Sequence, residues 1–279
     1  MADNNTLIFD VFCYNGEPIV ELRLALLAPV VDRFYIVESR STFSGLSKPA
    51  LYKDINSGLF EPYESKITWI ILDDDYFHSA QGNAWRREAK SRNAPLEHIF
   101  QHMAAAVRRS PYLLLVCDVD EIPRPEIVMS LRHQENYLLF KDPVALQMDF
   151  FYYNFAWIKN FKWNHPYVVS EETLLKRPDL DTIRLSPKSK QVSNAGWHCS
   201  FFETMENIIR KIESFSHQEH NKESMKSPAY ICACMAGGID VFARGVNEDL
   251  VPYQITELPD QMQAFHHKIV EMQQRFKDV

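Results

Sequence analysis

Residues 112–117 (YLLLVC) form a continuous apolar run that leads directly into residues 118–121 (DVDE). A short apolar run of this kind, bounded by turn-forming residues, is typical of a buried strand. The Ile-Pro-Arg-Pro sequence that follows stops the strand and begins a helix at Pro125. Asp118 and Asp120 therefore follow the carboxyl end of a buried strand, where open α/β sheets usually bind ligands.

The residues before this strand alternate between strand and helix patterns. Apolar and β-branched runs predict strands at residues 6–14, 33–38 and 66–72. Helical spacing of apolar residues predicts a helix at 19–27 and, across 83–109, one helix or two that are broken near Pro95. This alternation is typical of βαβ units, so we expect an α/β fold with a mixed, mainly parallel central sheet flanked by helices.

The second half of the sequence has a different pattern. Apolar runs predict strands of a more antiparallel region at 144–153 and 167–169, and helical spacing predicts helices at 203–215 and 264–277. No internal repeat, low-complexity tract or Gly/Ser linker separates the two halves of the sequence. We therefore expect one continuous domain over residues 1–279.

The composition excludes several classes of protein. An apolar share of 46% excludes a largely disordered chain, and a net charge of −7 argues against a broad nucleic-acid-binding surface. The five cysteines lack a regular disulfide framework. The N-terminus lacks the pattern of a signal peptide, and no stretch approaches the roughly 20 apolar residues that cross a bilayer. We expect a cytoplasmic protein without a membrane-spanning segment.

The acidic segment after the central strand predicts a metal site. Side chains two apart on an extended segment project to the same side, so Asp118 and Asp120 are expected to face one site. Two hard oxygen donors suit Mn²⁺ or Mg²⁺, with diphosphate oxygens completing the coordination. Residues 73–75 (DDD) and 179–181 (DLD) match the same D-x-D pattern. The apolar run behind Asp118 and the proline-rich segment after Glu121 favour the copy at 118–120.

Several blocks of the sequence resemble glycosyltransferase family 17, in matching order over about residues 7 to 250. The similarity is strongest at residues 118–123 (DVDEIP) and 195–202 (AGWHCSFF). Further blocks lie at residues 9–17, 21–23, 30–34, 37–39, 42–45, 85–88, 92–93, 215–219 and 238–242.

This resemblance implies a fold and a reaction. The family implies a GT-A-type (Rossmann-like) nucleotide-diphospho-sugar transferase fold, dependence on Mn²⁺ and inversion at the anomeric carbon. The donor is expected to be a UDP-sugar, with N-acetylglucosamine the expected sugar, and the acceptor a glycan that is linked in the β configuration. Residues 6–125 are then the nucleotide-sugar-binding half, and residues 126–279 are the acceptor-side half.

Roles at the metal end follow from the D-x-D segment and from the resemblance. Asp120 and Asp118 are expected to contact the metal, and Asp118 also the ribose or diphosphate of the donor. Glu121 either contacts the metal or caps the turn. His198 is a candidate metal ligand, since GT-A enzymes often complete their metal site with a histidine late in the chain.

Other residues are candidates for binding the donor. Arg86, Arg87 and Arg92 lie on or near the helix before the central strand, and the guanidinium fork suits a diphosphate. The alternative for these arginines is a solvated helix face. Glu38, at the end of the second predicted strand, either accepts a hydrogen bond from uracil or ribose or caps a helix or turn.

Inversion by direct displacement needs a carboxylate that accepts the proton of the acceptor hydroxyl. The candidates in the second half are Asp149, Glu203, Glu219 and Asp240. We rank Asp240 and Glu203 first, because Glu203 closely follows the GWHCSFF block and Asp240 lies in a Gly-Gly-Ile-Asp loop. Trp197 and Trp157 are candidate stacking surfaces for acceptor sugars, although a buried tryptophan is the commoner case.

Two other functions are compatible with a similar fold. A sugar-1-phosphate nucleotidyltransferase places a glycine-rich basic loop after its first strand, whereas this sequence has Asn-Gly-Glu-Pro there and only 8 glycines overall. A glycan- or nucleotide-binding protein on an inactive GT-A fold need not keep the carboxylates of the D-x-D segment. The intact carboxylates therefore favour the transferase.

Overall fold

The computed structural model describes residues 6–105, 110–133, 141–188, 190–244 and 250–274. Its strands are β1 (Leu7–Cys13), β2 (Arg33–Ser39), β3 (Ile67–Leu72), β4 (Tyr112–Val116), β5 (Glu121–Pro123), β6 (Val144–Tyr152), β7 (Asn154–Lys159), β8 (Tyr167–Ser170), β9 (Lys190–Ser200) and β10 (Leu250–Pro252). Its α-helices are α1 (Val20–Leu27), α2 (Tyr52–Ile55), α3 (Ser57–Phe60), α4 (Ala84–Asn93), α5 (Pro95–Ala105), α6 (Pro125–Leu131), α8 (Glu171–Lys176), α9 (Leu180–Leu185), α10 (Met205–Ser214), α11 (Pro228–Gly237) and α12 (Asp260–Gln274).

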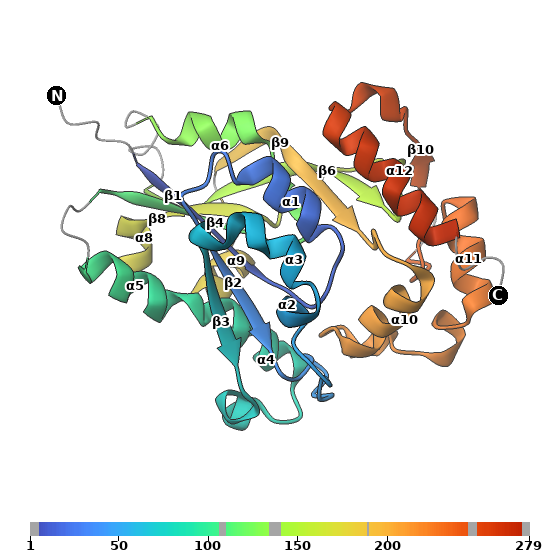
Figure 1. Cartoon of the computed structure of the whole chain (residues 1–279), viewed down its shortest axis with the longest axis horizontal. Coiled ribbons are helices and arrows are strands. Elements are labelled where there is room, and N and C mark those ends of the chain that lie inside the picture. The colour runs from blue at the N-terminus through green and yellow to red at the C-terminus, as the bar shows by residue number, and fades with distance from the viewer. Residues whose placement is uncertain (1–5, 106–109, 134–140, 189, 245–249, 275–279) are drawn as a thin grey trace.

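These strands form a 10-stranded sheet that contains strands from both halves of the chain. Its order is β10-β7-β6-β8-β4-β1-β2-β3, with β9 beside β6 and β5 beside β9. β4, β1, β2 and β3 run parallel to one another, as the βαβ pattern predicted. Figure 1 shows this sheet as the centre of the molecule, with helices packed against it.

The sheet is mixed, as expected, but the expectation that it is mainly parallel is wrong, because antiparallel pairs dominate the second half, where the sequence indicated a more antiparallel region. β8 lies antiparallel to both β4 and β6, β7 lies antiparallel to β6 and β10, and β5 lies antiparallel to β9. Parallel neighbours require a crossover of a dozen or more residues. In the second half β9 returns parallel to β6, but other neighbours are joined by tight connections. Tyr153 alone separates β6 from the antiparallel β7 and takes a left-handed φ of 66°.

Alternating side chains of the central strands supply two apolar cores, one on each face of the sheet. From β4, Leu113 and Leu115 pack with α1, α6 and α12, whereas Leu114 and Val116 pack with α5, α8 and α9. All five residues of β4 are buried, as expected for a strand covered on both faces. A third apolar cluster lies under α10 and α11, which Figure 1 places with α12 at one end of the molecule.

Most elements predicted from the sequence are present at nearly the predicted positions. The helical region after residue 83 is divided at Pro95 into α4 and α5, and α6 begins at Pro125. The ends of two predicted helices, at residues 106–109 and 275–277, lie outside the described residues. The sequence analysis did not predict β5, β7, β9, β10, α2, α3, α8, α9 or α11.

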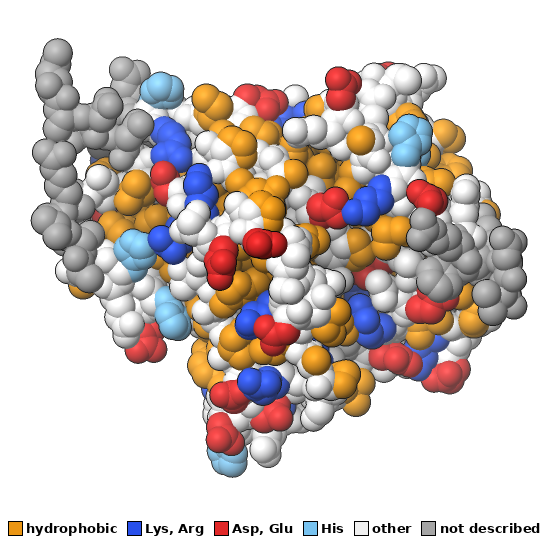
Figure 2. Space-filling view, viewed as in Figure 1, with side chains coloured by type: hydrophobic (Ala, Val, Ile, Leu, Met, Phe, Trp, Pro, Cys, Tyr) orange, Lys and Arg blue, Asp and Glu red, His pale blue; other side chains and the backbone are white. Residues whose placement is uncertain are grey.

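Two surface properties concern the expected partners. Within the described residues, no helix has both the length and the apolar character needed to cross a membrane. On the face drawn in Figure 2, basic and acidic side chains are interspersed rather than separated into large patches of one sign.

Candidate functional site

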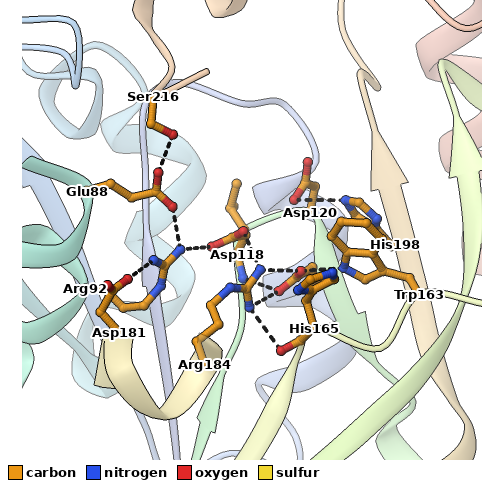
Figure 3. A network of polar contacts seen from close by, with 12 residues as sticks. Glu88, Arg92, Asp118, Asp120, Trp163, His165, Asp181, Arg184, His198 and Ser216 are labelled. Carbon is orange, nitrogen blue, oxygen red and sulfur yellow. Dashed lines mark hydrogen bonds and ion pairs between the residues drawn. The ribbon is translucent and has the colours of Figure 1, made fainter. Parts of the chain in front are cut away.

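The D-x-D segment is a tight turn at the carboxyl end of β4. The strand ends at Val116, and the Glu121 N–H donates to the Asp118 carbonyl at 3.0 Å, which closes a turn over residues 118–121. The expectation that Asp118 and Asp120 share one side assumed an extended segment and is wrong. In Figure 3 Asp118 faces Arg92 and Arg184, while Asp120 faces His198.

Arg23 of α1 binds the backbone of this turn. This side chain lies on α1, is fully buried, and forms an ion pair with Asp10 of β1, with 2.9 Å between Nε and Oδ2. Its Nη1 donates to the carbonyl oxygens of Asp118 at 3.0 Å and Glu121 at 2.7 Å. Arg23 therefore fixes the backbone of the acidic turn to the first strand and the first helix.

Two arginines hold the Asp118 carboxylate. Arg92 of α4 donates to Oδ1 at 3.1 Å, and Arg184 of α9 donates to Oδ2 at 2.8 Å. Burial opposes the charge of Asp118, but Arg184 and Arg92 outweigh it and hold its pKa below the ordinary value. Arg92 also pairs with Glu88, at 2.8 Å, and with Asp181. Asp118 is ionised and shares its charge with a surrounding network of arginines (Figure 3).

Glu121 is committed to the turn. The side chain is fully buried, and Oε1 accepts from Trp163 Nε1 at 2.6 Å and from Arg184 at 2.7 Å. Its Oε2 accepts from the Asp118 N–H at 2.6 Å and from Arg184 at 3.1 Å. With both oxygens occupied by protein donors, the capping role fits this geometry and the metal-ligand role does not.

Asp120 lies between a histidine and a lysine from later elements. β9 pairs with β5 so that His198 stands opposite Glu121, which brings its Nε2 to 3.7 Å from Asp120 Oδ1. Lys211 of α10 places its Nζ 3.2 Å from Asp120 Oδ2. His198 is buried and stacks between the rings of Phe150 and Trp163. Burial lowers the pKa of His198, which favours a neutral imidazole.

Asp120 and His198 fit a divalent cation. Two ligand atoms that each bind a common ion at about 2.1 Å lie at most about 4.2 Å apart. The 3.7 Å between Oδ1 and Nε2 is within that span. A carboxylate and a neutral imidazole both suit Mn²⁺, and waters or donor oxygens can complete the coordination. The other two residues expected at the metal, Asp118 and Glu121, have their carboxylates paired with Arg184 instead.

Two further carboxylates belong to the surroundings of Lys211. Glu203, at the start of the α10 region, is buried, and burial raises its pKa to about 7, while Lys211 acts in the opposite direction. Glu17, in the loop after β1, also has a raised pKa, first from burial. Burial disfavours the charge of Lys211, but Asp120, Glu203 and Glu17 together raise its pKa. Lys211 is thus a partly buried cation whose charge is balanced by three carboxylates.

The other donor-binding candidates lie away from this network. Glu38 caps the N-terminus of α2: its two oxygens accept from the N–H groups of Tyr52 at 2.6 Å and Lys53 at 3.0 Å. The capping alternative therefore describes Glu38. Arg87 donates to Ser41 at 2.8 Å, and Arg86 is exposed on the outer side of α4. Of the three candidate arginines, Arg92 is the one that reaches Asp118.

Asp240 has the contacts of a structural carboxylate rather than a base. It accepts from Tyr152 at 3.1 Å, Lys159 at 2.8 Å and Arg244 at 2.8 Å. Burial opposes its ionisation, but Lys159, the Phe242 N–H and Arg244 hold its pKa below the ordinary value. A carboxylate this well paired is a poor proton acceptor, so the geometry does not support the catalytic ranking of Asp240.

The remaining two carboxylates of the second half also have side-chain partners. Asp149 pairs with Arg124 and Lys162, and Glu219 pairs with His217. Glu203 differs, because within the described part of the chain its carboxylate has no hydrogen-bond donor. Among the four candidates, only Glu203 combines burial, a raised pKa and the neighbourhood of Asp120.

The tryptophans expected to stack on sugars do not face the acidic turn. Trp197 is 1% exposed, belongs to the core beneath α1 and α12, and has the Arg124 guanidinium over its ring at 4.2 Å. Trp157 packs against Gly238 and the third apolar cluster. Trp163, which the sequence analysis did not select, is the tryptophan at the site, where its half-buried ring contacts His198 and its Nε1 donates to Glu121.

Sequence reasoning missed the cations that organise the site. Arg184 follows one of the competing D-x-D matches, on a short helix that was not predicted, and its sequence context carries no signal. Lys211 lies on a helix that was predicted, but a lysine on an amphipathic helix is ordinarily solvated. Arg23 did carry a signal, since it interrupts the apolar series of α1 between Leu22 and Leu24.

Comparison with known proteins identifies the family of the chain. Curated relatives include the β-1,4-mannosyl-glycoprotein 4-β-N-acetylglucosaminyltransferases of Homo sapiens and Rattus norvegicus, each 25% identical over 223 residues, and that of Mus musculus, 24% identical over the same length. Each match covers 70% of this chain and 40% of the relative, so the chain spans less than half the length of these proteins. The model of glycosyltransferase family 17 matches residues 2–274. The chain therefore belongs to glycosyltransferase family 17.

Proposed function

We propose that this chain is an inverting, metal-dependent glycosyltransferase with a GT-A-type fold. It transfers a sugar, N-acetylglucosamine by the names of its relatives, from a UDP-sugar to a glycan acceptor in β linkage. One observation carries this proposal: the acidic turn after β4 directs Asp120 toward His198, in the neighbourhood of the buried Glu203. Candidate groups for binding the metal, for activating the acceptor hydroxyl and for stabilising the leaving group thus lie close together.

The parallel part of the sheet supports a nucleotide-sugar site of the GT-A type. β3, β2, β1 and β4 lie side by side in that order, as in the first half of a Rossmann-like sheet. The acidic turn follows the carboxyl end of β4, and the loop that carries Glu17 follows the carboxyl end of β1. Neighbouring parallel strands that end at one edge of a sheet form a crevice of the kind that binds nucleotides.

Asp120 and His198 are the residues that would hold Mn²⁺ or Mg²⁺. When bound, such an ion offsets the charge that develops on the departing nucleoside diphosphate. Lys211 supplies a second, permanent positive charge beside Asp120, with its Nζ 3.2 Å from Oδ2. Arg92 and Arg184, which now hold Asp118, offer guanidinium groups that suit the ribose–diphosphate end of the donor.

Glu203 is the proposed general base. Its carboxylate accepts the proton of the acceptor hydroxyl as that oxygen attacks the anomeric carbon and the bond to the diphosphate breaks. A pKa of about 7 suits this role, because general bases work best when their pKa is near the operating pH. Trp163 presents a half-buried ring beside His198 and is the candidate surface for stacking on a sugar.

A donor panel tests the proposal. The purified chain is incubated with Mn²⁺ and with each of several UDP- and GDP-sugars, and nucleotide release is measured with and without a glycan acceptor. We expect release from UDP-N-acetylglucosamine that stops when the metal is chelated. Asp120→Asn should abolish this release, while Asp74→Asn, in an exposed D-x-D match, should leave it intact. Unchanged release in Asp120→Asn would refute the proposed site.

A further inference from the structure

A second group of potential metal ligands lies outside the site described above. His217, Glu219 and His220 each offer one ligand atom, and these three atoms lie within 4.8 Å of one another. The three residues belong to a short segment that continues α10 and contains the 3₁₀ turn Gln218–His220. Two imidazoles and one carboxylate form the ligand set that zinc commonly takes when a fourth position is left to water.

The backbone of this segment is fixed, so the three side chains are held near one another. The His220 N–H donates to the His217 carbonyl at 3.0 Å. The Gln218 side chain turns back and donates to the Phe215 carbonyl at 2.7 Å. Glu219 already accepts from His217, with 2.7 Å between Oε1 and Nδ1. The Asn221 side chain donates to Gln218, which secures the far end of the turn.

Aromatic neighbours orient both imidazoles. Trp85 of α4 meets the His217 ring edge-to-face at 4.4 Å, and Phe242 stacks on the His220 ring at 4.4 Å. His217 and Glu219 are half exposed, at 50% and 56%, so an ion can enter from solvent. A metal site needs ligands that are oriented by their surroundings and an open path, and this segment has both.

We propose that His217, Glu219 and His220 bind one transition-metal ion of the Zn²⁺ class, separately from the metal proposed at Asp120 and His198. Ligand atoms around a tetrahedral zinc at about 2.1 Å lie about 3.4 Å apart. The side chains reach this arrangement when the short contact between His217 and Glu219 opens and the widest separation, 4.8 Å or less, closes. Imidazole nitrogen selects Zn²⁺ over Mn²⁺ here, in keeping with the Irving–Williams order.

The segment is connected to the acidic turn through α4. Ser216, directly before His217, donates to Glu88, which pairs with Arg92, which in turn pairs with Asp118 (Figure 3). Trp85, Glu88 and Arg92 lie on one face of α4, since they are three and four residues apart. One proposed ligand, His217, therefore lies against the helix that also supplies Arg92. The proposal rests on this local geometry and not on the proposed transferase activity.

Metal titration of the whole chain tests the site. The chain is first stripped with a chelator, and the Asp120→Asn background removes the other proposed metal site. Zn²⁺ binding is measured by calorimetry, and Ni²⁺ binding by quenching of the Trp85 indole, with Trp85→Phe as the check on the origin of the signal. We expect one Zn²⁺ per chain and weaker binding of Mn²⁺.

His217→Ala and His220→Ala should each weaken Zn²⁺ binding by at least about tenfold. Glu219→Gln, at a half-exposed position that leaves the fold unchanged, should also weaken it. His133→Ala is the matched control, because it removes an exposed histidine elsewhere and should change nothing. Circular dichroism confirms that each variant is folded. Zn²⁺ binding by His217→Ala and Glu219→Gln as tight as in the unmodified background overturns the proposal.

Discussion

The guanidinium of Arg23 donates to the backbone carbonyl of Glu121, with 2.7 Å between Nη1 and the oxygen. The same guanidinium is paired with the fully buried Asp10. A charge on the first helix thereby sets the position of a turn that lies 98 residues later in the sequence. The shape of the acidic turn depends on this buried pair as well as on its own residues.

Arg23→Met should strongly destabilise the chain. The substitution leaves the Asp10 carboxylate buried without a partner, and removing one member of a buried ion pair typically costs about 3–5 kcal/mol. Urea denaturation measures the free energy of unfolding. Arg40→Met is the matched control: Arg40 and Asp73 form an exposed pair, whose loss costs about 0–1 kcal/mol. Equal losses in the two variants would contradict this account of the turn.

Gly196→Ala should separate His198 from the acidic turn. A Cβ at Gly196 would lie 2.3 Å from the Ile122 carbonyl oxygen, so β9 cannot stay paired with β5 without a backbone shift. We expect a loss of about 1–3 kcal/mol in unfolding free energy. The affinity for Mn²⁺ should fall as well, because the pairing of β9 with β5 sets His198 opposite Glu121 and so positions it beside Asp120.

Gly58→Ala is the matched control for that variant. A Cβ at Gly58 meets nothing within 4 Å, and Gly58 lies in the helix α3, where alanine is favoured by roughly 0.5–1 kcal/mol. Urea denaturation should therefore show unchanged or slightly raised stability. Similar effects of the two alanine substitutions would mean that the close approach of β9 to β5 does not determine the site.

The sequence predicts the part of the fold in which local pattern decides the structure. β4 is a fully apolar run, α4 and α5 are divided by a proline, and α6 begins at one. The sequence indicated a more antiparallel second half, but not that antiparallel pairs would make up so much of the sheet, because strand pairing there depends on tight connections and on contacts between distant segments. β9 carries mainly polar residues in its first half and has no apolar run that would mark a strand.

The sequence predicted which residues could bind a metal, but not which side chains would surround them. Asp120 and His198 were selected from motif and resemblance, and the structure brings them to 3.7 Å. The partners of Asp118 could not be selected, because Arg92 and Arg184 become neighbours only when α4 and α9 pack beside the end of β4. Asp118 was expected on the same side as Asp120, because side chains two residues apart share a side on an extended backbone. The backbone here is a four-residue turn, so this expectation failed.

Arg92→Ala should reduce transfer from the UDP-sugar. Its guanidinium holds Asp118, and a hydrogen bond to a charged group contributes about 1.5–3 kcal/mol, so kcat/KM should fall roughly 10- to 150-fold. Steady-state nucleotide release measures this change. Arg86→Ala is the control on the same helix, because Arg86 is exposed to solvent, and it should leave kcat/KM unchanged. If both variants lost activity equally, the assignment of Arg92 to the donor end would fail.

Glu203→Gln should remove most of the transfer activity and the pH dependence that Glu203 supplies. A general base must be ionised to accept the hydroxyl proton, so activity of the unmodified chain should rise with pH through about 7. Loss of a general base typically lowers kcat about 10²- to 10⁴-fold. The residual activity of Glu203→Gln should lack that rise. Glu206→Gln, at an exposed position of α10, should keep both the activity and the pH profile.

The same substitution should change stability in a pH-dependent way that does not depend on catalysis. The pKa of Glu203 is raised in the folded chain, first by burial, so its favourable contribution is complete below its ordinary pKa and is lost as pH rises through about 7. Glutamine stays neutral at every pH and avoids that loss. Urea denaturation should therefore find Glu203→Gln more stable than the unmodified chain at pH 8, with a smaller difference at pH 5. A difference that is the same at both pH values would show that the Glu203 carboxyl is not held neutral by its surroundings, whatever its part in transfer.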